Sequence, residues 1–82
     1  MVHHYFYLAR CSDGSLYAGT CLDLAERERL HSSGKGAKYT RGRGPVEMVY
    51  HEAYATLGEA RRREVQVKRL PKAAKERLVL GD

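Results

Sequence analysis

The chain has 82 residues, of which 43% are hydrophobic and 30% charged, and its formal net charge is +5. That length suits one small domain and excludes dinucleotide-binding and barrel enzymes, which need far longer chains. The hydrophobic fraction is too high for a disordered chain. We therefore expect a single folded domain that spans residues 1–82.

The net positive charge is concentrated in one stretch. Residues 29–46 contain five basic side chains and no acidic one, whereas the rest of the chain holds equal numbers of both signs. Such a stretch is typical of a surface that contacts phosphates. The alternative is a solvated loop that only maintains solubility.

The two cysteines carry no recognisable metal or redox motif. Cys11 and Cys21 are too few for a disulfide framework and are not spaced as Cys-x-x-Cys. We interpret both as reduced and half-buried. The apolar run at residues 5–9 is too short for a signal peptide or a membrane span. We therefore expect a cytoplasmic protein that does not contact membranes.

The first part of the chain predicts a β-hairpin. Residues 5–9 and 16–20 are typical of strands, and Ser12-Asp13-Gly14 between them is typical of a turn. A three-residue turn with a left-handed Gly14 would place Tyr7 opposite Gly19, and on the same sheet face as Tyr17. A two-residue turn would place the two tyrosines on opposite faces.

The remaining elements follow from caps and breakers. Asp23 can cap a helix from Leu24 to about Ser32, and glycines make residues 34–45 a loop. Residues 46–54 are typical of a third strand. Thr56 and Glu59 form a capping box for a helix from Leu57 to about Arg69, and Pro71 suits the first turn of a third helix that Gly81 ends.

Two polar residues fall on the apolar face of the first predicted helix. At 100 degrees per residue, Arg27 and His31 lie in the gap between Leu24 and Leu30. They could belong to a functional site. Alternatively, Arg27 extends its charged end to solvent and His31 is a hydrogen-bonded residue at the edge of the core.

Glu64 has a similar position on the second predicted helix. It lies within the apolar arc, so its carboxylate needs a cation or a metal ion nearby. The alternative is an ordinary pair with Lys68, four residues further along the helix.

The candidate residues suit phosphodiester hydrolysis. A phenol can take a proton from water, a guanidinium can neutralise the phosphate, and a metal ion held by one carboxylate can stabilise the leaving oxygen. Mg²⁺ keeps most of its waters and tolerates a site with so few protein ligands. The sequence contains no phosphate-binding Gly-x4-Gly-Lys loop and no histidine pair at metal spacing.

The same residues resemble a known family. Tyr5-Phe6-Tyr7, Tyr17-Ala18-Gly19 and the later Arg27 and His31 are similar to the GIY-YIG nuclease domain. Residues 33–41 and 60–70 resemble its small, stand-alone bacterial branch. The resemblance runs from about Tyr5 to Leu80. Tyr5, Phe6 and Ala18 depart from the family's motifs, but at packing positions.

The resemblance implies an α/β fold in which a three-stranded antiparallel sheet is flanked by three helices, in the order β-β-α-β-α-α. It also implies an endonuclease that uses Mg²⁺ or Mn²⁺. By position, Gly19 is the motif glycine, Arg27 stabilises the phosphate and Glu64 is the metal ligand. The catalytic residues it implies are Tyr7, Tyr17, Arg27, His31 and Glu64.

We therefore predict a DNA endonuclease of repair or recombination, acting on structured or single-stranded DNA. A protein partner could supply specificity, because the chain has no additional DNA-selecting domain. The alternatives are a non-catalytic nucleic-acid-binding module and a subunit active only with a partner. In each case the predicted nucleic-acid contacts are Lys35, Lys38, Tyr39, Arg41 and Arg43.

Overall fold

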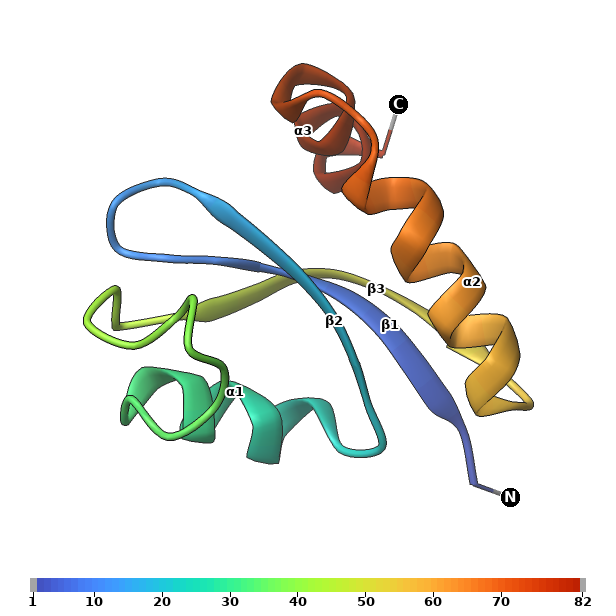
Figure 1. The fold of residues 1–82 in the computed structure, drawn as a ribbon, viewed down its shortest axis with the longest axis horizontal. Helices are drawn as coiled ribbons and strands as arrows, with labels where there is room; N and C mark the ends of the chain where they lie inside the picture. Colours follow the sequence, from blue (N-terminus) through green and yellow to red (C-terminus); the bar gives the residue numbers. More distant parts are fainter. Residues whose placement is uncertain (1, 82) are drawn as a thin grey trace.

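The computed structural model describes residues 2–81 and has the predicted order of elements (Figure 1). The strands are β1 (His4–Arg10), β2 (Leu16–Cys21) and β3 (Glu47–Tyr54), and the helices are α1 (Leu24–Ser32), α2 (Leu57–Lys68) and α3 (Lys72–Leu80). The strands form one antiparallel sheet in the order β2-β1-β3. This arrangement confirms the predicted fold class.

The hairpin between β1 and β2 has the register that brings the two tyrosines together. Tyr7 lies opposite Gly19, and the Cys11 N–H donates to the Ser15 carbonyl at 2.9 Å, which closes a three-residue turn. Gly14 in that turn has φ of 85°, a left-handed conformation that glycine adopts at little cost. The prediction of an odd-length turn is therefore confirmed.

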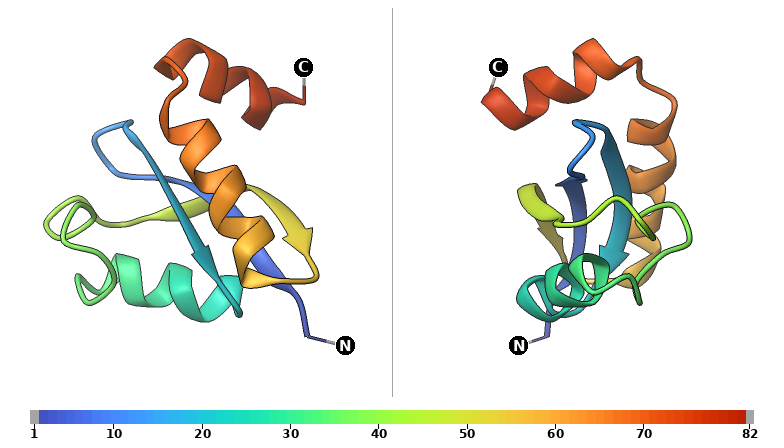
Figure 2. Two further views of the ribbon diagram at one scale, coloured as in Figure 1. Left: turned by 45° about the vertical axis from the view of Figure 1, so that its right-hand side comes forward. Right: turned by 90° about the vertical axis from the view of Figure 1, so that its left-hand side faces the viewer.

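The two faces of the sheet carry different helices, as the turned views in Figure 2 show. Tyr7 and Ala9 belong to the core cluster on the side of α1, whereas Phe6 and Leu8 pack with Val67 of α2. This alternation follows from the two-residue period of a strand. In the sheet, β2 is an edge strand, and in Figure 1 it runs between α1 and α2.

Four predicted details need correction. Pro71 is the N-cap of α3 and not part of its first turn, because its extended ψ of 158° precedes the helix. The second predicted helix ends one residue early, since Arg69 is its C-cap, and β3 begins at Glu47, one residue late. The cysteines are free, as predicted, but they are buried and not half-buried, since both belong to the core cluster around Tyr7.

The segment between α1 and β3 contains neither helix nor strand, as predicted. The C-terminal end of this segment is hydrogen-bonded to the hairpin turn, where the Ser12 N–H donates to the Arg43 carbonyl at 2.8 Å. Among residues 2–81, no helix is both long and apolar enough to cross a lipid bilayer. The cytoplasmic location stays a prediction.

Candidate active site

A buried tyrosine and a buried histidine form the inner part of the candidate site. Tyr7 and His31 are each 1% exposed, and Tyr7 Oη lies 2.7 Å from His31 Nε2. Tyr7 points from β1 toward the helix that carries His31, whose Asp23 cap accepts a hydrogen bond from the Glu26 N–H at 3.0 Å. The two residues selected from separate sequence patterns thus contact each other directly.

The second nitrogen of the same imidazole is held by the loop. His31 Nδ1 lies 2.8 Å from Thr40 Oγ1 and 3.3 Å from the Ala37 amide nitrogen. The loop reaches the ring closely because Gly36 has no side chain: a Cβ there would lie 2.2 Å from Nδ1. Sequence reasoning missed both Thr40 and Gly36. The available signal was that a buried histidine needs a partner for each ring nitrogen.

Burial sets the protonation of the pair. It raises the pKa of Tyr7 well above its usual range, and the neighbouring Tyr17 acts in the same direction. Burial also lowers the pKa of His31, and the positive charge of Arg27 lowers it further. Near neutral pH the pair is therefore an uncharged phenol against an uncharged imidazole.

The second motif tyrosine shares the face of Tyr7 and forms an aromatic wall. The Tyr17 ring lies 6.3 Å from that of Tyr7 and 5.3 Å from that of His31, centre to centre. On its other side Tyr17 stacks on Tyr39 of the loop at 5.6 Å. Gly19 provides the space for this packing, since a Cβ there would lie 2.5 Å from Tyr7 Oη.

Glu64 lies on α2, and its ion-pair partner Lys68 is near the Tyr17 ring. The Glu64 carboxylate pairs with the Lys68 ammonium at 2.6 Å, so the ion pair that the sequence offered as the alternative is present. The Glu64 side chain is 20% exposed. The Lys68 ammonium also lies 5.9 Å from the centre of the Tyr17 ring. The pair therefore faces the tyrosines and not bulk solvent alone, and Glu64 raises the pKa of Lys68.

Arg27 carries a positive charge that acts on Tyr7, His31 and Cys21. It also lines a pocket of about 390 Å³ that extends toward the start of α2 and includes Arg61. Within residues 2–81, Arg27 makes no ion pair with an acidic side chain. Its positive charge is thus available to a ligand.

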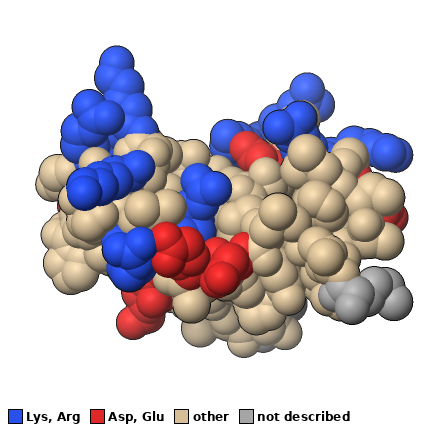
Figure 3. All heavy atoms as spheres, turned by 90° about the horizontal axis from the view of Figure 1, so that it is seen from below, with Lys and Arg blue, Asp and Glu red and all other residues tan. Residues whose placement is uncertain are grey.

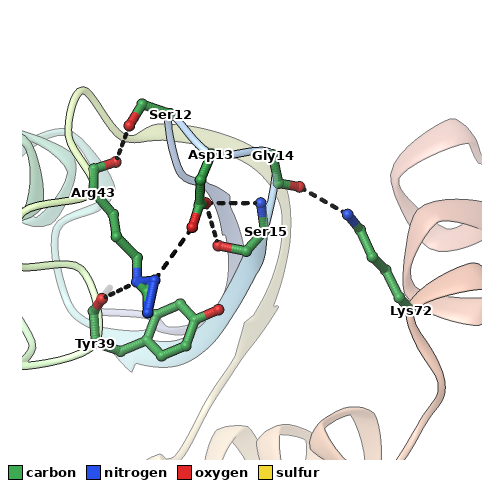
Figure 4. Close-up of polar contacts among 7 residues, drawn as sticks. All are labelled: Ser12, Asp13, Gly14, Ser15, Tyr39, Arg43 and Lys72. Atoms are coloured by element: carbon green, nitrogen blue, oxygen red, sulfur yellow. Dashed lines mark hydrogen bonds and ion pairs between the residues drawn. The ribbon is translucent and has the colours of Figure 1, made fainter.

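The five predicted nucleic-acid contacts divide into two groups. Lys35, Lys38 and Arg41 are exposed, and their side chains form no ion pair within the described part of the chain. Arg43 instead lies 4.4 Å over the ring of Tyr39 and pairs with Asp13 at 3.2 Å (Figure 4). Arg43 therefore fastens the loop to the hairpin turn.

The surface has more than one basic region. Figure 3 shows Lys and Arg side chains gathered in two groups toward the two sides of one face. The sequence stretch 29–46 accounts for the net charge, but exposed Arg61 and Arg62 add basic side chains on α2. Basic side chains therefore lie both on the loop and on α2, and β2 runs between these two segments in Figure 1.

The donor set limits what metal the site could hold. In the described residues no three His, Cys, Asp or Glu side chains come together as a metal cluster. Among the described residues, Glu64 is the carboxylate whose charge acts on Tyr7, and a single carboxylate fits only an ion that keeps most of its waters, as Mg²⁺ does.

Comparison with known proteins agrees with this geometry. Residues 3–77 match the family model of the GIY-YIG catalytic domain. A UPF0213 protein of Bacillus pumilus is 58% identical over 66 residues, which cover 80% of this chain and 67% of that protein.

Two solved structures are similar to the whole fold. The solution structure of the UPF0213 protein BH0048 of Bacillus halodurans is 49% identical, with a TM-score of 0.60, and the match covers 94% of this chain and 82% of that one. The solution structure of EF2693 of E. faecalis is 40% identical, with a TM-score of 0.62 and the same coverage. Together with the family match, these relatives show that the chain belongs to the GIY-YIG family, as a small protein of the UPF0213 type.

Proposed function

We propose that this protein is a divalent-metal-dependent endonuclease that hydrolyses phosphodiester bonds in DNA. Family membership supports nuclease chemistry in general. The observation that carries the specific proposal is the contact of Tyr7 Oη with His31 Nε2, at 2.7 Å, next to Arg27 and within the electrostatic reach of Glu64. A phenol with its own proton acceptor, beside a cation, is suited to activate water against a phosphate.

Tyr7 is the better candidate for the residue that takes the proton from water. Its raised pKa means that it remains a neutral phenol, which can accept a proton only if it passes its own to another group. His31 Nε2 is placed to receive that proton, and its lowered pKa keeps it neutral beforehand. Tyr17 has no such hydrogen-bonded acceptor among the described residues, and we assign it to the wall that orients the substrate.

The proposed reaction moves two protons and exchanges one bond at phosphorus. One proton of the attacking water moves to Tyr7 Oη while the phenolic proton moves to His31 Nε2. The resulting hydroxide forms a bond to phosphorus as the bond to the leaving oxygen breaks, and solvent supplies the proton for that oxygen. Arg27 stabilises the extra negative charge on the phosphate, and His31 later returns its proton to solvent.

A bound Mg²⁺ or Mn²⁺ would supply positive charge beside the leaving oxygen. Glu64 is the residue we assign to hold it, with waters as the other ligands. To do so the carboxylate must exchange Lys68 for the ion, because Lys68 now pairs with it at 2.6 Å. The pair is partly exposed, so water weakens its attraction and the exchange costs little free energy.

The basic loop is proposed to bind the phosphate backbone through Lys35, Lys38 and Arg41, with Tyr39 available to stack on a base. Tyr39 is 42% exposed and stacks on Tyr17, so a base bound there would lie directly beside the candidate site. Arg43 acts indirectly by holding Tyr39. A role in DNA repair or recombination, in the cytoplasm and with a partner protein for specificity, is part of the same proposal.

The proposal is tested by incubating the full chain with branched, single-stranded and duplex DNA and RNA, with and without Mg²⁺ or Mn²⁺. We expect metal-dependent strand cleavage that Glu64→Gln abolishes and that Glu47→Gln, an exposed acidic position on β3, leaves unchanged. Salt-sensitive binding without hydrolysis in either metal would favour the non-catalytic binding module instead. Cleavage that appears only after cell extract is added would favour a partner-dependent subunit.

A further inference from the structure

We infer that Thr40 is a positioning residue that fixes the tautomer of His31, so that Nε2 is the proton acceptor facing Tyr7. The inference deepens the proposed function, on which its catalytic meaning rests. Thr40 is 0% exposed although it lies in the exposed basic loop, between Tyr39 and Arg41. Its side chain is turned inward, where Oγ1 lies 2.8 Å from His31 Nδ1.

The hydrogen-bond donors around the imidazole decide the tautomer. Within residues 2–81, the Tyr7 hydroxyl has His31 Nε2 as its one hydrogen-bond partner. If Nε2 carried the proton, it would donate to Tyr7 Oη and the buried phenolic proton would have no acceptor. If Nε2 is unprotonated, the phenol donates to it and the proton lies on Nδ1.

The loop then provides the acceptor for that second proton. His31 Nδ1–H donates to Thr40 Oγ1, whose own proton goes to the Ala37 carbonyl at 3.0 Å. The Ala37 amide nitrogen lies 3.3 Å from both Thr40 Oγ1 and His31 Nδ1, and when Nδ1 carries the proton the Ala37 N–H donates to Thr40 Oγ1. In this arrangement every donor has an acceptor, and the chain runs from the phenol through the imidazole and the threonine to the backbone. The opposite tautomer leaves the Tyr7 proton without a partner.

Gly36 completes the arrangement by letting the loop approach the ring. A Cβ at position 36 would lie 2.2 Å from Nδ1 and within 2.9 Å of two ring carbons, so even alanine would push the imidazole away from Thr40. The backbone of Gly36 is not in the left-handed region. Alanine at this position would therefore act through the contact with His31 and not through backbone strain.

The basic loop thus has two roles in the proposed function. The basic side chains on the loop are proposed to bind phosphate, and the same loop carries the hydroxyl that orients the proton acceptor. Residues with no contact to the substrate would thus control the direction of proton transfer in the Tyr7–His31 pair.

The test reads the tautomer directly by imidazole ¹⁵N NMR of the full chain, with the His31 signals assigned by comparison with His31→Gln. We expect the wild type to show a protonated Nδ1 and an unprotonated Nε2. Thr40→Val should abolish that signature and lower cleavage about tenfold, the usual cost of removing a group that orients a functional histidine. Thr40→Ser should restore both. Thr20→Val on β2 is the matched control for the loss of a hydroxyl.

A second pair of variants tests the same tautomer if Thr40→Val is poorly folded. Gly36→Ala should lose the Nδ1–H signature, whereas Gly58→Ala should keep it, because a Cβ at position 58 would meet no atom closer than 3.9 Å. A protonated Nε2 in the wild type, or an unchanged tautomer in folded Thr40→Val, would overturn the inference. Since the tautomer is read without substrate, its failure is distinguishable from failure of the nuclease proposal.

Discussion

The two sides of the candidate site differ in how their polar groups are satisfied. On the side of α1, Tyr7, His31 and Thr40 are buried and hydrogen-bonded to one another. On the side of α2, Glu64 and Lys68 form a partly exposed ion pair. Folding alone fixes the first group, because a buried polar group without a partner is costly. The second group is partly exposed, and the proposed function requires a metal ion to replace Lys68 there.

Arg27, whose charge acts on Tyr7 and His31, is the residue whose removal is expected to have the largest effect. Arg27→Ala should lower cleavage by about 10²- to 10³-fold, the usual cost of losing one group that stabilises charge in the transition state. The measurement is single-turnover cleavage at saturating enzyme. Arg29→Ala is the control, because Arg29 is on the same helix but pairs with Glu26 at the surface. Equal losses in both variants would show that Arg27 has no special role.

On the open side, removing Lys68 should make metal binding easier. In Lys68→Met the Glu64 carboxylate no longer pairs with an ammonium, so the Mg²⁺ concentration for half-maximal cleavage should fall about threefold, as expected for a partly exposed ion pair. A Mg²⁺ titration of cleavage measures this, with Lys75→Met on α3 as the control for the lost charge. A higher Mg²⁺ requirement would mean that Lys68 helps to bind the substrate or the ion and does not compete with it.

On the buried side, His31 should make stability depend on pH. Burial and Arg27 lower its pKa below the ordinary 6.5, so the unfolded chain binds this proton more readily than the folded protein. The stability that the neutral His31 contributes is therefore fully present above pH 6.5. It is lost as the pH falls through the lower pKa that His31 has in the folded protein.

Denaturation at several pH values tests this difference. Between about pH 7.5 and 5 the wild type should lose unfolding free energy through His31, and His31→Gln should not show this loss. His51→Gln, an exposed position on β3, should keep the wild-type dependence. The same slope in His31→Gln and the wild type would mean that another group is responsible.

The smallest effect is expected from single lysines of the basic loop. Lys38→Ala should weaken DNA binding only a few-fold and reduce the slope of log affinity against log salt by about one, since one phosphate contact is lost. Binding measured at several salt concentrations gives this slope, and Arg77→Ala on α3 is the control. An unchanged slope would place Lys38 outside the contact surface.

The sequence predicted the elements and most of the site because those features have local signals. The spacing of Tyr7 and Tyr17 about a three-residue turn determines their shared face, and the helical angle of Glu64 identifies a carboxylate next to a buried surface. Thr40 and Gly36 could not be found in the same way. Their contact with His31 crosses an irregular loop, which has no periodicity to indicate which side chain turns inward.

The partners of Arg43 could not be predicted from the sequence either. Its position in a basic stretch predicts a phosphate contact, which stays a prediction, and the fold places its side chain beside Asp13 and Tyr39. Asp13 belongs to the hairpin turn, 30 residues earlier in the chain. Composition gives the charge of a segment, whereas only the tertiary structure shows which of its charges are already paired.

The most direct test of the account is single-turnover cleavage by Tyr7→Phe, with Tyr5→Phe as the matched control. Removing the Tyr7 hydroxyl deletes the group that contacts His31 Nε2 at 2.7 Å, while the ring can still fill the core. We expect a folded protein whose metal-dependent cleavage falls at least about 10²-fold, the usual contribution of a proton-transferring side chain, with Tyr5→Phe close to the wild type. Wild-type cleavage by folded Tyr7→Phe would contradict the proposed proton transfer through Tyr7 to His31.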